Sequence, residues 1–221
     1  MSPRERVVAS LVGLTGVSVG LFVAGALANH SLQFGYMLWN LFLAWLPFLV
    51  SAGLLRSLHR HLWSSRWPLL LTLLWLLLLP NTFYMISDFI HLQDVARHNL
   101  LYDVVMFTSF IFTAALLGFS SLYLVQAELR KRVSLRTSSL LIGGVIFLCS
   151  FAIYLGRDLR WNSWDVLVNP AGILFDVSDH LIHPFQQGDM FSMTASFFVL
   201  LSSLYVVGWQ LGEATRHETV D

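Results

Sequence analysis

The sequence contains few charged residues and a single cysteine. Lys, Arg, Asp and Glu together make up 12% of the 221 residues, whereas soluble domains contain about 25%. The formal net charge is zero, so the chain offers no basic field for binding nucleic acid. Cys149 stands alone, which excludes an internal disulfide framework and a cysteine-based zinc site. The chain also lacks a glycine-rich phosphate loop and an HExxH motif, so neither of these motifs assigns a reaction class.

Apolar residues dominate what is present. The chain is 56% hydrophobic with a mean hydropathy of +0.67, and its apolar runs reach the length of about 20 helical residues that a bilayer core requires. Only helices and closed barrels satisfy their backbone hydrogen bonds in lipid, so we expect an all-α polytopic membrane protein, a bundle of six transmembrane helices. One domain is predicted over residues 1–221, with spans at 7–28, 34–55, 67–90, 101–125, 138–156 and 190–211.

The first span has an alternative interpretation. Residues 26–29 read ALAN and follow a basic start and an apolar run, which resembles a signal-peptide cleavage site. The length of the run favours an uncleaved anchor, and a cleaved signal peptide stays the alternative.

The basic residues predict the orientation of the spans. Of the 13 Lys and Arg residues, all but Arg97, Arg157 and Arg160 lie at the termini or in loops on one side. The positive-inside rule places that side, and with it both termini, in the cytoplasm. All the aspartates except Asp221, and most of the eight histidines, fall on the other side. The residues capable of chemistry therefore gather at the extracytoplasmic face.

The third span ends in a polar stripe. The motif LPNTFYMISDFIHL contains Asn81, Tyr84, Asp88 and His91 at intervals of three, four and three residues, which share one face of an α-helix. Pro80 removes a backbone hydrogen bond and predicts a kink where the stripe begins. We predict that the stripe lines a polar site in the membrane. The alternative is a helix end that emerges into water.

Two further polar residues are predicted to accompany the stripe. Asn40 lies about two turns into the second span from its outer end, and its amide could bond to Asn81, bind a ligand or join helices. Asp103 stands near the start of the fourth span, where a carboxylate is stabilised by the helix dipole. Two interpretations of Asp103 stay open: this capping role, and completion of a cluster with Asp88 and His91.

The long outer loop, residues 157–189, begins with a second group of polar residues. Arg157, Arg160, Asn162 and Asp165 surround two tryptophans, which are typical of a membrane interface. Two arginines three residues apart can bind carboxylates or phosphates with their forked donors. An ion-pair network with the aspartates and a binding site for an anion are both compatible with this pattern.

The second half of this loop predicts an interfacial amphipathic helix. Asn169 and Pro170 form an N-cap and first helical position. The polar face carries Asp176, Asp179, His180 and His183. Such a face could bind a metal through imidazole and carboxylate groups, although a solvated polar face is the commoner explanation.

Several of these motifs resemble one known family. WNLFLAWLPF, LPNTFYMISDFIHL, the YD pair at 102–103 and GRDLRWNSWD are similar to motifs of the bacterial multi-pass membrane proteins known as domain of unknown function 1361. The resemblance covers roughly residues 30–185 and implies a helical bundle in the bacterial cytoplasmic (inner) membrane, without an established activity. The matching positions are Asn40, Pro47, Pro80, Asn81, Tyr84, Asp88, His91, Tyr102, Asp103, Arg157, Arg160, Asn162, Ser163 and Asp165.

We expect a membrane-embedded enzyme or binding protein with a polar site at the outer face. The candidate catalytic residues are Asp88, His91, Asp103 and Asp165, and the candidate substrate-binding residues are Asn40, Asn81, Tyr84, Arg157, Arg160 and Asn162. An anionic or lipid-linked molecule suits such a site, because the membrane delivers the tail and the arginines hold the head group. A divalent metal ion held by Asp88, His91 and Asp103 is a further alternative.

Two other function classes stay open. A transporter or channel would need polar residues throughout the membrane, and the inner halves of the spans contain few apart from Ser51 and Thr72. A non-catalytic membrane partner of a cell-envelope complex would use the polar cluster only to stabilise the loop. The lipid bilayer is the expected surrounding, and no oligomeric state is predicted.

Overall fold

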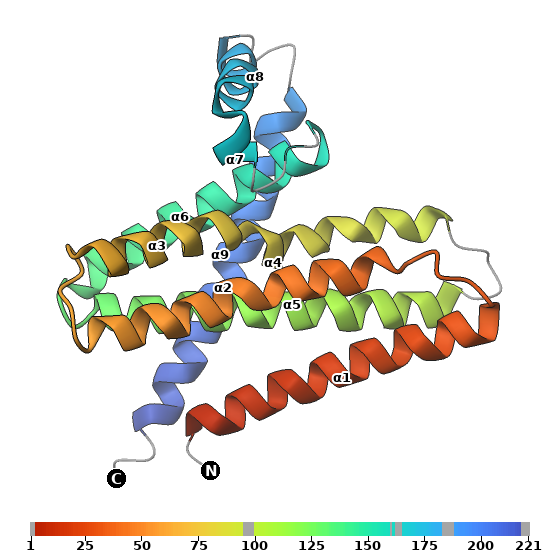
Figure 1. Cartoon of the computed structure of the whole chain (residues 1–221), viewed down its shortest axis with the longest axis horizontal. Coiled ribbons are helices and arrows are strands. Elements are labelled where there is room, and N and C mark those ends of the chain that lie inside the picture. The colour runs from red at the N-terminus through yellow and green to blue at the C-terminus, as the bar shows by residue number, and fades with distance from the viewer. Residues whose placement is uncertain (1–2, 95–99, 160, 162–164, 183–187, 218–221) are drawn as a thin grey trace. The chain divides into compact units, whose positions relative to one another are not determined.

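The computed structural model describes residues 3–94, 100–159, 161, 165–182 and 188–217. The regular structure of these residues is entirely helical, and six helices are long and apolar enough to cross a membrane (Figure 1). Both the predicted all-α class and the predicted number of spans are confirmed. The spans are Glu5–Asn29, Tyr36–Leu58, Arg66–Gln93, Leu100–Leu129, Leu135–Arg157 and Met190–Ala214. Helices of this composition contact the lipid bilayer.

The chain divides into two compact units, Met1–Ser121 and Leu122–Asp221. Helix α5 (Leu100–Leu129) contributes its first part to unit 1 and its last turns to unit 2. Each unit has its own packing and is described by itself. The organisation of the chain as one domain stays a prediction.

Unit 1 contains α1 (Pro3–Asn29), α2 (Tyr36–Leu58), α3 (Arg66–Leu78), α4 (Pro80–Tyr84), η1 (Met85–Asp94) and the first part of α5. Helix α1 begins at a proline, whose missing N–H needs no partner in a first turn. It ends at Asn29, and the next residue, His30, adopts a left-handed conformation with φ of 48°. The N–H of Ser31 donates to the carbonyl of Ala26 at 3.2 Å, the hydrogen bond of a Schellman cap. The ALAN segment therefore forms the last turn of a capped helix.

The third span is interrupted at Pro80, as predicted. Helix α3 ends at Leu78, α4 begins at Pro80, and the chain continues from Met85 as the 3₁₀-helix η1. Proline cannot donate to the carbonyl four residues before it, so this region has fewer backbone donors. The side chain of Asn81 supplies one, because its Nδ2 donates to the carbonyl of Leu78 at 3.0 Å.

One buried chain of hydrogen bonds joins three helices of unit 1. The indole Nε1 of Trp75 on α3 donates to Oγ of Ser121 on α5 at 2.7 Å. Ser121 Oγ in turn donates to the carbonyl of Pro47 on α2 at 3.1 Å. Trp75 is 2% exposed and Ser121 is fully buried, so water cannot replace these partners. These bonds fix the position of α2 along the length of α5. Helix α2 also packs against α3 (Figure 1).

A glycine allows α4 to approach α5 closely. A Cβ atom added at Gly118 would lie 2.8 Å from a ring carbon of Phe83 and would overlap the hydroxyl of Thr82. Phe83 and Thr82 are themselves fully buried. The absence of a side chain at position 118 therefore permits this contact between the two helices.

Polar contacts also connect α1 to its neighbours in unit 1. Ser18 Oγ lies 3.0 Å from Thr113 Oγ1 of α5. The phenolic oxygen of Tyr102, near the start of α5, donates to the carbonyl of Leu21 at 2.6 Å. Gly25 leaves room for the Tyr102 ring, since a Cβ atom there would lie 2.9 Å from it. Helix α1 is thus held against α5 at two positions along its length.

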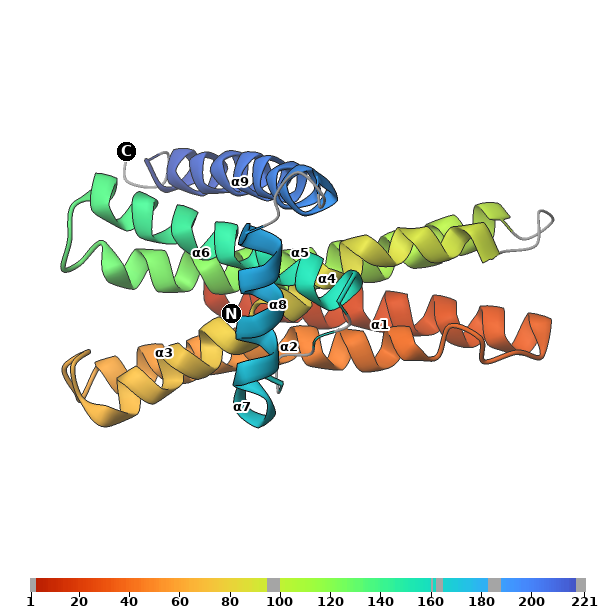
Figure 2. The same cartoon turned by 90° about the horizontal axis from the view of Figure 1, so that it is seen from above.

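Unit 2 contains the last turns of α5, α6 (Leu135–Arg157), α7 (Asp165–Val168), α8 (Pro170–Ile182) and α9 (Gly188–His217). Helices α6 and α9 pack against each other (Figure 2). Buried Gln126 of α5 bonds to both: its Nε2 donates to Ser139 Oγ at 3.3 Å, and its Oε1 accepts from Tyr205 at 2.6 Å. Arg130 forms an ion pair with Glu213 at 2.9 Å. Unit 2 is therefore held together by polar contacts as well as by apolar packing.

The predicted inner halves of the spans contain more polar residues than expected. Ser121, Gln126 and Ser138 are buried there in addition to Ser51. Each makes a hydrogen bond to another side chain or to a helix carbonyl. The expectation that Ser51 and Thr72 are the main polar residues is therefore wrong. Single Ser and Gln residues barely lower the hydropathy of a long apolar run, so they are easily overlooked.

Replacing Gly118 with Ala is expected to destabilise unit 1 by about 1–3 kcal/mol, because the new methyl group would overpack against Phe83 and Thr82. Gly53→Ala is the matched control. Nothing lies within 4 Å of a Cβ added there, and Ala stabilises a helix interior by roughly 0.5–1 kcal/mol relative to Gly. The free energy of unfolding in mixed micelles is the measurement. Equal effects of the two substitutions would contradict the close contact of α4 with α5.

Candidate functional site

The start of α2 and the 3₁₀-helix η1 are joined by two of the predicted site residues. The amide Nδ2 of Asn40 donates to Oδ2 of Asp88 at 3.1 Å. Asp88 is 2% exposed and Asn40 is half-buried. A carboxylate at this depth needs a polar partner, and the amide both meets this need and fixes the orientation of the carboxyl group. The structure thus gives Asn40 a partner on the third span, which is Asp88 and not Asn81.

A second contact between the same elements involves His91. Its ring lies 5.3 Å from the ring of Tyr36, with an interplanar angle of 62°. This edge-on packing restricts the orientation of the imidazole. Tyr36 was not among the predicted site residues, although it lies four residues before Asn40 and so on the same face of α2. We call Tyr36, Asn40, Asp88 and His91 the η1 site.

The predicted α-helical stripe exists only in part. Asn81 and Tyr84 lie in α4, whereas Asp88 and His91 lie in η1. In a 3₁₀-helix residues three apart are eclipsed, so Asp88 and His91 share a face directly. Asn81 donates to the Leu78 carbonyl, and the carbonyl of Tyr84 accepts from Ser87 at 2.7 Å.

Asp103 lies at the same end of unit 1, in the first turn of α5. Phe107, one turn later on the same face, packs edge-on against Phe34 with ring centroids 5.0 Å apart. Because Phe34 directly precedes α2, residues 34–40 contact both α5 and η1. Asp103 is only 6% exposed. It forms no hydrogen bond or ion pair with any residue that the structure describes.

The predicted residues of the long loop belong to unit 2. Arg157 is the last residue of α6 and is half-buried, and Asp165 begins α7. Arg160, Asn162 and Ser163 lie outside the described residues. It stays a prediction that these loop residues lie close to the η1 site.

The predicted amphipathic helix is present as α8. The side-chain oxygen of Asn169 accepts from the N–H of Gly172 at 3.1 Å, which confirms Asn169 as the N-cap. Asp176, on the polar face, accepts from the indole Nε1 of Trp161 at 2.8 Å. Gly172 leaves space for this tryptophan, since a Cβ there would lie 2.8 Å from the indole ring. Asp176 therefore serves to hold Trp161 against α8.

The metal alternatives gain no support from the described part of the chain. No three His, Cys, Asp or Glu side chains among its residues lie close enough together to hold one metal ion, and this applies to the candidate ligands Asp88, His91 and Asp103. On the α8 face, His183 and the side chains of Asp179 and His180 lie outside the described residues.

Comparisons with known proteins identify a family but no activity. No curated protein matches the chain, and no solved structure matches it. The family described as protein of unknown function (DUF1361) matches residues 39–204, three quarters of the chain. This range contains Asn40, Asp88, His91, Asp103 and Arg157. The chain therefore belongs to the DUF1361 family.

Proposed function

We propose that this protein is a membrane-embedded enzyme or binding protein that takes an anionic or lipid-linked substrate at the extracytoplasmic face. The supporting observation is the state of two carboxyl groups at one end of unit 1. Asp88 is buried and oriented by Asn40, whereas Asp103 is buried without a partner among the described residues. Ionisable groups are costly within membrane helices, so a carboxyl group kept there without a structural partner favours a role toward a ligand.

The η1 site has the groups required for proton transfer. Asp88 and His91 share a face of η1, and each is restricted by a residue of α2. A carboxylate and an imidazole placed in this way can act as general base and general acid toward a bound hydroxyl or ester. Preorganisation by Asn40 and Tyr36 supports this role, because catalytic side chains must be held in one orientation.

The charge of the site suggests a division of roles. Asp88 and Asp103 would repel an anionic group placed directly against them. The phosphate or carboxylate of the substrate therefore binds Arg157 and Arg160, whose guanidinium groups offer forked donors. Asp165, eight residues after Arg157, is assigned to the catalytic carboxyl groups rather than to anion binding. The reacting part of the substrate then reaches Asp88 and His91.

Asp103→Asn tests whether the carboxyl group serves a ligand or the fold. We expect the variant to be at least as stable as the wild type in thermal unfolding of the purified protein, because Asn removes an unpartnered ionisable group of the same shape. Asp158→Asn, at an exposed position, is the control and should not change the stability. A clear loss of stability in Asp103→Asn would indicate a structural role instead.

Asp88→Asn tests the chemistry of the η1 site. Asn preserves the shape and can still accept from Asn40, so the variant should accumulate in the membrane at the wild-type level. Cells lacking the protein are supplied with wild type, Asp88→Asn or Asp158→Asn, and their lipids and phosphorylated metabolites are compared by mass spectrometry. Wild type and Asp158→Asn are expected to restore the profile and Asp88→Asn is not. Restoration by Asp88→Asn, or its failure to accumulate, would favour a structural polar network.

The proposed role of Arg157 and Arg160 is tested with the compound that the mass-spectrometry comparison of wild type and Asp88→Asn identifies. Arg157→Ala and Arg160→Ala are each expected to weaken its binding to the purified protein by about 1.5–3 kcal/mol, the contribution of a charge-assisted hydrogen bond. Arg136→Ala is the control, because Arg136 is exposed and lies at the opposite end of α6 from Arg157. Ligand-induced thermal stabilisation, titrated for each variant, gives the affinities. Unchanged affinity in both loop variants would remove the arginines from the site.

A further inference from the structure

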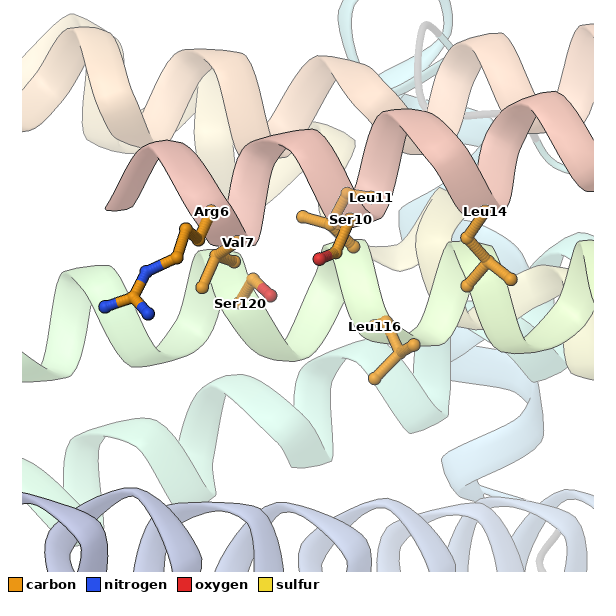
Figure 3. Close-up of a pocket in the computed structure, with 7 residues that line it drawn as sticks. All are labelled: Arg6, Val7, Ser10, Leu11, Leu14, Leu116 and Ser120. Atoms are coloured by element: carbon orange, nitrogen blue, oxygen red, sulfur yellow. The ribbon is translucent and has the colours of Figure 1, made fainter. Parts of the chain in front are cut away.

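A groove between α1 and α5 lies at the other end of unit 1 from the η1 site. Its volume is about 490 Å³, within the range of roughly 300–1,000 Å³ that is typical of small-molecule sites. Residues of both helices line it, as Figure 3 shows: Arg6, Val7, Ser10, Leu11, Leu14, Leu116 and Ser120. Both helices are long enough to span a membrane.

The polarity of the groove changes in one direction along its length. Arg6, Ser10 and Leu14 follow each other at intervals of four residues, so they lie on one face of α1 about 6 Å apart along its axis. The opposite wall repeats this order, since Ser120 lies toward the Arg6 end and Leu116 toward the Leu14 end (Figure 3). The polar side chains of the groove therefore gather toward the Arg6 end, where Val7 also lies, and the opposite end is apolar.

The polar groups of the groove have no partners within the described part of the chain. Arg6, Ser10 and Ser120 make no side-chain hydrogen bond or ion pair with any residue that the structure describes. By contrast, Thr15 and Ser18 of the same helix both donate to backbone carbonyls. Hydroxyl groups in membrane helices usually form such bonds, so the two groove serines remain available for an external acceptor.

We propose that this groove binds a phospholipid. The phosphate lies on Arg6, whose guanidinium is the preferred partner of phosphate in proteins. The glycerol ester carbonyls accept from Ser10 and Ser120, and an acyl chain follows Leu11, Leu14 and Leu116. The order of these groups along the lipid is the order of their counterparts along the groove. Arg6 lies at the end of unit 1 that the basic residues predict to be cytoplasmic, so the lipid comes from the inner leaflet.

Native mass spectrometry of the full-length protein in detergent, titrated with phosphatidylglycerol, tests this proposal. We expect one phospholipid to bind with a defined affinity, and Arg6→Gln to weaken that affinity about tenfold, as the loss of one charge-assisted contact predicts. Arg66→Gln is the matched control, because Arg66 is an exposed arginine at the first residue of α3 and does not line the groove. It should leave the affinity unchanged. Equal losses in both variants, or no loss in Arg6→Gln, would overturn the proposal.

A second pair of measurements keeps the test independent of Arg6. Leu116→Trp fills the apolar part of the groove and is expected to weaken phosphatidylglycerol binding at least tenfold, whereas Leu140→Trp, on a 72% exposed side chain of α6, should not. Glycerol phosphate is titrated as a competitor, since it carries the head-group chemistry without a tail. If glycerol phosphate does not compete with phosphatidylglycerol, the result supports recognition of the whole lipid. Displacement of the lipid by glycerol phosphate, or wild-type binding by Leu116→Trp, would contradict it.

Discussion

Polar atoms in a membrane helix need hydrogen-bond partners within the protein, and unit 1 is organised by this requirement. The bonds from Trp75 to Ser121 and from Ser121 to the Pro47 carbonyl join three helices in the buried interior. The bond from Asn40 to Asp88 joins the start of α2 to η1. Packing then places the remaining groups, as at Gly118, where no side chain separates α5 from α4.

Against this background two sets of polar groups stand out in unit 1, one at each end. Asp103 is buried without a partner at one end, and Arg6, Ser10 and Ser120 are without partners at the other, among the described residues. The two sets differ in chemistry. The first is a single carboxyl group at the end of the unit that holds the η1 site, and the second contains a cation and hydroxyl groups followed by an apolar wall. Under the two proposals, the same unit serves a substrate at one end and a lipid at the other.

The sequence predicted those features that depend on local pattern. Apolar runs located the six spans, Pro80 located the break in the third span, and Asn169 located the start of α8. It could not predict which helices face each other, because that depends on their rotation and depth in the bundle. Such rotations place Tyr36 beside His91 and bring Ser121 within hydrogen-bond distance of the Pro47 carbonyl. The 3₁₀ form of η1 also escaped prediction, since an interval of three residues fits either helix type.

The tighter winding of η1 has a geometric consequence for the third span. Ten residues, Met85–Asp94, extend about 20 Å as a 3₁₀-helix but about 15 Å as an α-helix. Conversion to the α form would draw the outer end of this segment inward by about 5 Å. It would also turn His91 about 60° away from Asp88, because three residues complete a full turn only in the 3₁₀ form. The relative orientation of the His91 imidazole and the Asp88 carboxylate is thus set by the helix type of η1. A change from the 3₁₀ to the α form would separate them without breaking a hydrogen bond within α2.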